Sequence, residues 1–202
     1  LGFMAAFRGM DITNDTAAYY RTYQKIAYSG FAGETRMEIG YVALNVFLTH
    51  IFQDTLVGFH VLLFITSVFC YGALEQWIER HAITYGICVI TFYFLSNQSY
   101  MSAIRQSVAV GFILWALMAM EDLNGRKRYI VYALLIAFAT LFHKTAVVAL
   151  IFPFLMKREY TRNTTWLLML ITLVATLTNV VSSVISILGL RTGYVTTEIG
   201  NA

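Results

Sequence analysis

Two short segments of this sequence place cationic side chains inside long apolar stretches. The first segment runs from Asn97 to Ala109 and carries one arginine, Arg105, and the second carries His143 followed by Lys144. A guanidinium keeps its charge in a protein, so an arginine in or near hydrocarbon must face water, a carboxylate or a phosphate. We therefore predict that Arg105 faces an anionic, lipid-linked substrate. For His143 and Lys144 the residues leave two readings open, a functional pair or an interfacial pair.

The longest polar segment, from Arg8 to Glu38, offers further candidates. Arg8 is a third cation for the same site, although pairing with Asp11 or Asp15 at the surface is an alternative that would contribute little energy. The run Thr13 to Thr16 supplies N-cap residues for a short helix through Ala27.

Tyr19 and Tyr23 are spaced i,i+4 and so share one face of that short helix. Tyrosines at such positions commonly anchor an interfacial helix, and that is the first interpretation of this pair. The second is an aromatic shelf that holds sugar rings.

The composition identifies an integral membrane protein. Of 202 residues, 58% are hydrophobic and only 12% are charged, with a mean hydropathy of +0.65, whereas soluble domains carry about a quarter charged residues. The net charge of +3 is small and the basic residues form no single face, which argues against a nucleic-acid partner. Cys70 and Cys88 lie in apolar runs and make no ligand pattern with the histidines, so no disulfide, metal site or cofactor is expected.

The apolar segments predict an all-α, polytopic membrane protein with about six to eight membrane helices, some short or re-entrant, in one domain over residues 1–202. The beginning at Leu1 within an apolar run suggests an internal piece of a longer protein. The residues from 8 to 40 form the loop with the short helix. The expected apolar segments are Gly40–Phe52, Thr55–Trp77, Ala82–Ser96, Gln106–Met120, Ile130–Phe142, Thr145–Met156 and Thr165–Leu190.

Several of these segments are too short to cross a bilayer. A helix of 12 to 15 residues spans only about 18–22 Å, against a hydrocarbon core of ~30 Å. Residues 130–156 are either one span with His143 in its middle or two short helices that meet there, and the basic clusters at both ends favour the second reading. Short helices on both sides of Arg105 and His143 would place both residues below the outer surface, in an outward-facing, water-filled cavity.

The short loops also predict the orientation. Arg80, the cluster from Arg126 to Arg128, and the cluster from Lys157 to Arg162 alternate with loops that hold Arg105 or Lys144. The positive-inside rule puts the first set in the cytoplasm and the second outside. Helix N-termini near Ser102 and Thr145 would then join Arg105, Lys144 and Arg8 around one depression, which suits a diphosphate.

Four motifs carry a family resemblance. They are Phe7-Arg8 leading to Asn14-Asp15-Thr16 and Tyr19, then Glu38–Tyr41, then Ser102–Ala109, and last Leu141–Ala146. In this order and approximate spacing they resemble the EpsG family of exopolysaccharide and O-antigen polymerases, the Wzy class. The resemblance extends from end to end of the chain, and the Ile-Arg-Gln piece at 104–106 and the Phe-His-Lys piece at 142–144 are its most specific parts.

The resemblance implies a multi-pass protein of the bacterial inner membrane that polymerises polyprenyl-diphosphate-linked oligosaccharide units at the outer face. No metal is implied, and a chain-length regulator and a flippase are the protein partners to expect besides the lipid bilayer. Arg105 would contact the diphosphate, and His143 would hydrogen-bond the acceptor or act as its general base. Asp15 or Glu38 is the competing base. The remaining expected substrate-binding residues are Arg8, Lys144, Gln106, Glu38, Tyr19 and Tyr23.

Two other classes of function fit the same cations. A transporter or flippase of lipid-linked oligosaccharides would need an inverted repeat and access from both sides, and we see no internal repeat. A non-catalytic membrane scaffold of a polysaccharide assembly complex would tolerate the loss of Arg105.

Overall fold

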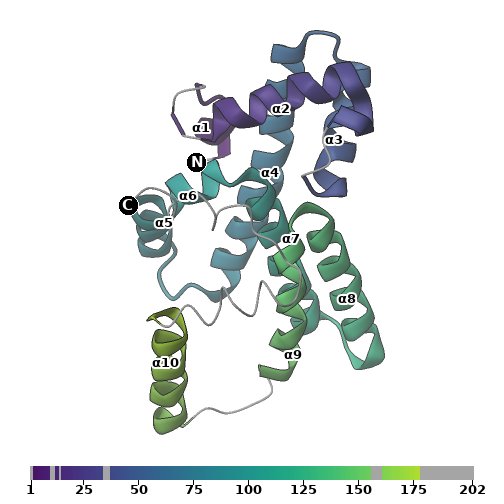
Figure 1. The fold of residues 1–202 in the computed structure, drawn as a ribbon. Coiled ribbons are helices and arrows are strands. Elements are labelled where there is room, and N and C mark those ends of the chain that lie inside the picture. Colours follow the sequence, from purple (N-terminus) through teal and green to yellow (C-terminus); the bar gives the residue numbers. More distant parts are fainter. Residues whose placement is uncertain (1, 10–11, 14, 34–36, 156–160, 178–202) are drawn as a thin grey trace. The chain divides into compact units, whose positions relative to one another are not determined.

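All regular secondary structure in the part of the chain that the structure describes is helical (Figure 1). The structure is a computed structural model and describes residues 2–9, 12–13, 15–33, 37–155 and 161–177. The predicted all-α class is therefore confirmed for these residues. The chain divides into two units, residues 1–150 and 151–202, and every residue expected at the site lies in the first.

Two helices of the described residues are long and apolar enough to cross a membrane. They are α4 (Thr55–His81) and α7 (Ile104–Asp122). The helix α7 is longer than the expected apolar segment 106–120, because it begins two residues earlier and so includes Arg105 in its first turn. The expected count of six to eight membrane helices remains a prediction.

These two long helices run in the same direction and end side by side. At their ends, Arg80 Nη1 lies 2.9 Å from Asp122 Oδ2. At the other end, Ile104 belongs to the same buried cluster as Leu62, seven residues into α4. Because a helix rises ~1.5 Å per residue, α7 begins about 10 Å further along this direction than α4 does. Arg105 is therefore set back from the end of the bundle at which α4 begins.

Shorter helices surround this pair. α1 (Gly2–Ala6) packs along α4, where a Cβ on Gly2 would lie 3.5 Å from Cβ of Tyr71. α3 (Ile39–Ile51) and α5 (Tyr85–Leu95) have 13 and 11 residues and reach only ~20 Å and ~17 Å, too short for a full crossing. The other short elements described before α7 are α2 (Thr16–Ser29), the 3-10 turn η1 (Gly30–Gly33) and α6 (Asn97–Ser102).

The chain reverses direction at His143, as the hairpin reading predicts. α8 (Gly125–Phe142) packs along α7, and Gly125 makes the turn between them with a φ of 62°, which only glycine adopts easily (Figure 1). After His143 the 3-10 helix η2 (Lys144–Ile151) returns beside α8, since the Tyr132 hydroxyl donates to the Ala149 carbonyl at 2.6 Å. Residues 130–156 are therefore not one continuous helix.

In the second unit the structure describes α9 (Phe152–Leu155) and α10 (Arg162–Leu177). The end of the expected final span, up to Leu190, lies outside the described residues.

Candidate active site

The carboxylate of Glu38 lies between Arg105 and His143. Its Oε2 accepts a hydrogen bond from Arg105 Nη1, and its Oε1 lies 3.6 Å from His143 Nδ1. The side chains of Glu38 and Arg105 are 10% and 17% exposed. Three residues that are 38 or more positions apart in the sequence thus form one partly buried cluster, which we call the Glu38–Arg105–His143 cluster.

Each member of the cluster sits at the end of a helix. Glu38 immediately precedes α3, Arg105 is the second residue of α7, and His143 immediately follows α8. The α7 N-terminus carries a partial positive charge, so an arginine there raises the local positive potential and favours an anion beside it. Glu38 supplies that anion in the structure.

A close approach of α3 and α8 brings Glu38 to His143. A Cβ at Gly40 would lie 2.8 Å from both Cβ and the carbonyl oxygen of Leu141. Any side chain at this position would therefore push α3 away from the end of α8. Glycine here is required by the contact and not by its own backbone angles.

Tyr19 forms one wall of the cluster. Arg105 Nε lies 3.5 Å from the Tyr19 hydroxyl, and Cζ lies 6.0 Å from the centre of its ring. Tyr19 in turn meets the ring of Tyr41 edge-on at 5.6 Å. Sequence reasoning missed Tyr41, although it directly follows Gly40 in the same motif.

The expected sugar-binding shelf is not formed by the two tyrosines of α2. Tyr19 is 8% exposed and Tyr23 is fully buried, because the face they share packs against α3 and α4 in the core rather than facing solvent. Tyr23 lies against Gly58 and Phe59.

Glu38 remains ionised at any physiological pH. Burial alone would raise the pKa of this carboxyl, but the neighbouring His143 and the charge of Arg105 outweigh burial and lower the pKa to about 2. A carboxylate with so low a pKa is a weak base. The imidazole of His143 is the other group of the cluster that can take a proton, and its Nδ1 is buried 3.6 Å from Glu38 Oε1, with no partner at hydrogen-bond distance among the described residues.

Arg8 lies in a separate buried site. Its Nε donates to Thr16 Oγ1 and its Nη1 to the Ala5 carbonyl, both at 3.0 Å. The residue is only 3% exposed, and Nη2 has no hydrogen-bond partner among the described residues. Arg8 is therefore not in a surface ion pair with Asp15. Asp11 lies outside the described residues.

The other expected site residues lie apart from the cluster. Asp15 precedes α2 and is exposed, and its side chain makes no capping hydrogen bond. Lys144 and Gln106 follow His143 and Arg105 directly but are exposed, and neither contacts the cluster through a described hydrogen bond or ion pair. The described residues also contain no group of three or more histidine, cysteine or acidic side chains that could hold a metal ion.

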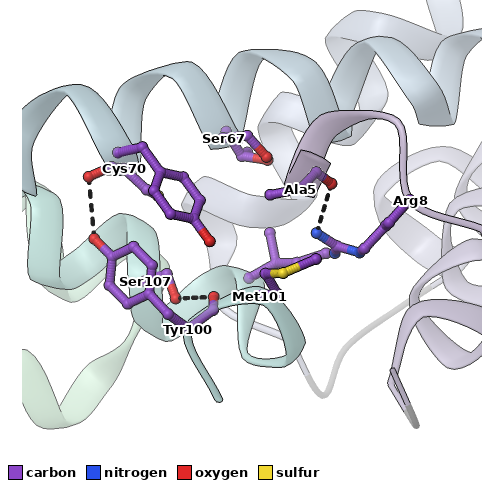
Figure 2. A pocket seen from close by; sticks show the side chains of 10 residues that line it. Ala5, Arg8, Ser67, Cys70, Tyr100, Met101 and Ser107 are labelled. Atoms are coloured by element: carbon purple, nitrogen blue, oxygen red, sulfur yellow. Dashed lines mark hydrogen bonds between the residues drawn. The ribbon is translucent and has the colours of Figure 1, made fainter. Parts of the chain in front are cut away.

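The cavity at Arg8 contains residues that sequence reasoning missed. Figure 2 shows the Arg8 guanidinium reaching into this cavity, with Ser67 and Tyr100 among its other lining residues. The Tyr100 hydroxyl donates to the Cys70 carbonyl at 3.1 Å, and Ser107 donates to the Tyr100 carbonyl at 2.5 Å. The sequence feature that could have indicated these residues is a hydroxyl-bearing side chain within an otherwise apolar segment. A buried tyrosine hydroxyl usually needs a hydrogen-bond partner, so such residues tend to lie together.

Comparison with known proteins identifies one match. A family model described as the EpsG family matches residues 1–198. No curated protein and no solved structure matches the chain.

Proposed function

Because this chain belongs to the EpsG family, membrane-associated proteins of exopolysaccharide biosynthesis, we propose that it polymerises polyprenyl-diphosphate-linked oligosaccharide units. The reaction would take place at the outer face of the bacterial inner membrane. The observation that carries the proposal is the Glu38 carboxylate between Arg105 and His143. The carboxylate lies between a permanent cation and a side chain that can accept a proton. Transfer of a sugar from a diphosphate needs one group of each kind, a cation for the leaving group and a base for the acceptor hydroxyl.

The transfer joins two lipid-linked molecules. A hydroxyl oxygen of the acceptor unit attacks the anomeric carbon of the donor sugar. The bond from that carbon to the diphosphate oxygen breaks, and the diphosphate leaves on its lipid with the electron pair. Arg105 stabilises the negative charge that develops on the leaving group, as a bidentate guanidinium does for phosphate oxygens.

His143 takes the proton of the acceptor hydroxyl. Glu38 is close to Nδ1, so it favours the tautomer with the proton on that nitrogen and leaves the second ring nitrogen free to act as base. This is the orienting role that a carboxylate plays beside a catalytic histidine in other enzymes. Asp15 is exposed and lies outside the cluster, so it has no part in the proposed mechanism.

Donor binding and base orientation are coupled through Glu38. In the structure the carboxylate accepts a hydrogen bond from Arg105, so an incoming diphosphate must compete with Glu38 for the guanidinium. When the diphosphate takes Arg105, Glu38 is left with the Nδ1–H of the neutral His143 ring as its partner. Glu38 is thus a positioning residue, which orients the base once the donor is bound.

The proposed orientation puts the beginning of α4 and the cluster on the outer side. Arg80 at the end of α4 and the basic residues Arg126 to Arg128 at the start of α8 then face the cytoplasm, in agreement with the positive-inside rule. With α7 beginning about 10 Å below the start of α4, Arg105 lies beneath the outer rim, at a depth that a lipid headgroup can reach.

The test is glycan ladder analysis in cells that carry Arg105→Ala or His143→Ala at normal protein level. We expect single repeat units to accumulate on lipid, with the ladder lost. The matched control is Arg21→Ala, which removes an exposed arginine of α2 and should leave the ladder intact. Substrate trapped on the cytoplasmic side would indicate a flippase, and an unchanged ladder in both variants would indicate a scaffold. Either result would overturn the proposal.

A further inference from the structure

Glu75 is a carboxylate on α4 that no described cation neutralises. The two basic side chains that follow it are paired with the end of α7 instead. Arg80 Nη1 lies 2.9 Å from Asp122 Oδ2, and His81 Nε2 lies 2.9 Å from Glu121 Oε1. None of the ion pairs among the described residues includes Glu75. A charged group so close to hydrocarbon favours a partner of opposite charge.

The position of Glu75 along α4 is that of a lipid headgroup. It follows the first residue of α4, Thr55, by about 30 Å. This distance equals the ~30 Å thickness of the hydrocarbon core. A helix that enters the core at its start therefore leaves it near Glu75. In the proposed orientation this is the cytoplasmic leaflet.

An apolar groove between α4 and α5 lies beside this carboxylate. It has a volume of about 250 Å³, and Glu75 lines it together with Leu74, Ile78, Val89 and Phe92. No residue of α5 is buried, so α5 does not pack closely against α4 along the groove. A ligand in the groove would fill the space between the two helices.

The dimensions of the groove suit a lipid chain. It extends along α4 from Tyr71 to Ile78, a length of about 10 Å, so its mean cross-section is about 24 Å². An α-helix with its side chains is about 10–12 Å wide and is too thick for this space. A single acyl chain is narrow and apolar, and so it matches the groove in both width and chemistry.

The groove also has polar groups near the turn that joins α4 to α5. Tyr85, the first residue of α5, lines the groove there together with Ile78, and Glu75 lies about one helical turn before Ile78. The first backbone N–H groups of α5 have no partner within the helix, and the N-cap residue Thr84 makes no capping hydrogen bond through its side chain. A helix N-terminus favours a phosphate. A site for a cation and a site for a phosphate thus adjoin one apolar groove.

We propose that the α4–α5 groove binds a phospholipid with a primary-amine headgroup, of which phosphatidylethanolamine is the simplest. Its ammonium group donates a hydrogen bond to Glu75, its phosphate lies at the N-terminus of α5, and one acyl chain extends along the groove towards Phe92. Charge complementarity selects this headgroup, because Glu75 repels a lipid with a net negative charge. A choline headgroup has no N–H group to donate to the carboxylate.

The bound lipid supplies the packing that α5 lacks. A ligand that binds only the folded state stabilises it, so this lipid should raise the unfolding temperature of the protein. The inference does not rest on the proposed polymerase reaction, because neither Glu75 nor the groove belongs to the Glu38–Arg105–His143 cluster.

The test is native mass spectrometry of the purified full chain, equilibrated in detergent with equal amounts of phosphatidylethanolamine, phosphatidylcholine and phosphatidylglycerol with the same acyl chains. We expect phosphatidylethanolamine to be retained in excess. Glu75→Gln should reduce this excess about fivefold, the loss expected for one hydrogen bond. The matched control is Glu79→Gln, one turn further along α4 and outside the groove lining, which should keep the excess. No excess in the wild type, an excess of phosphatidylglycerol, or an unchanged excess in Glu75→Gln would overturn the proposal.

A second pair of variants tests the groove itself. Val89→Trp fills the groove and should abolish both the retained phosphatidylethanolamine and the rise in unfolding temperature that this lipid causes. Ile87→Trp, at a residue of the same helix that is 63% exposed and outside the groove lining, should change neither. Equal effects of the two tryptophans would exclude the groove as the site of the acyl chain. Failure of the proposed polymerase function would appear instead in the glycan ladder, with this lipid preference intact.

Discussion

At the residue scale, the Arg105–Glu38 ion pair has a structural role and a proposed catalytic role, and the two can be separated by experiment. Removing one member of a buried ion pair leaves an uncompensated charge and typically costs about 3–5 kcal/mol. We expect Arg105→Gln to lower the unfolding temperature and to abolish polymerisation.

The double variant Glu38→Gln with Arg105→Gln removes both charges. It should recover most of the lost thermal stability in detergent, but polymer synthesis should stay absent. If the double variant regains synthesis along with stability, Arg105 is structural and does not act on the diphosphate.

The low pKa of Glu38 gives the stability a defined pH dependence. Its pKa falls from 4.5 to about 2 on folding, so the ionised carboxylate stabilises the fold above pH ~4.5, and this contribution is lost as the pH falls towards ~2. A shift of this size corresponds to about 3 kcal/mol. Thermal unfolding in detergent between pH 7 and 3 should show this loss in the wild type and a smaller one in Glu38→Gln. Parallel curves for the two proteins would contradict the pairing.

Sequence alone identified the members of the cluster, but not their contacts. Arg105 and His143 were recognisable because charged or titratable groups in an apolar chain are costly, and Glu38 because it begins one of the motifs that carry the family resemblance. That Glu38 bridges the other two depends on a contact between α3 and α8, which no local pattern encodes. The i,i+4 spacing correctly predicted that Tyr19 and Tyr23 lie on the same face of α2. Spacing alone does not say whether that face is exposed to solvent or packed in the core.

At the scale of elements, the α3–α8 contact at Gly40 should control the geometry of the cluster. Gly40→Ala places a methyl group 2.8 Å from the Leu141 backbone, and such overpacking costs about 1–3 kcal/mol. We expect lower thermal stability and reduced polymer length, because Glu38 moves away from His143.

The matched control for this substitution is Gly86→Ala. Gly86 is also the second residue of its helix, and a Cβ there meets nothing within 4 Å. Alanine at this site should be neutral or slightly stabilising, since it favours helix over glycine by up to about 1 kcal/mol. Equal effects of the two substitutions would mean that the α3–α8 approach is not what positions Glu38.

The break at His143 was predictable, whereas the form of the returning segment was not. Basic clusters at both ends of residues 130–156 indicated a hairpin, because both ends then face the same side of the membrane. The return as the 3-10 helix η2 depends on packing against α8, including the hydrogen bond from Tyr132 to Ala149, and the sequence carries no signal for it.

At the scale of the whole molecule, the orientation predicts which residues a membrane-impermeant reagent can reach. In a Cys70→Ser, Cys88→Ser background, Lys144→Cys should react with an impermeant maleimide in intact spheroplasts. Lys127→Cys, near the start of α8, should react only after permeabilisation. The reverse pattern would place the Glu38–Arg105–His143 cluster in the cytoplasm.

The predicted all-α class is confirmed for the described residues, and the predicted spans 55–77 and 106–120 lie within α4 and α7, which both extend further. The number of membrane helices did not follow in the same way. Short helices such as α3 and α5 satisfy their backbone hydrogen bonds whether they cross part of a bilayer or lie beside it, so length alone does not decide their role.

The most direct test of the account is a reconstituted reaction. The purified full chain in liposomes is given a synthetic repeat unit linked to polyprenyl diphosphate, and mass spectrometry follows joined units and released lipid diphosphate. We predict one lipid diphosphate released for each new glycosidic bond, with both products absent for His143→Ala and for the Glu38→Gln, Arg105→Gln double variant. Transfer of substrate across the bilayer without joining, or full activity in the double variant, would contradict the assignment of this cluster as the reaction centre.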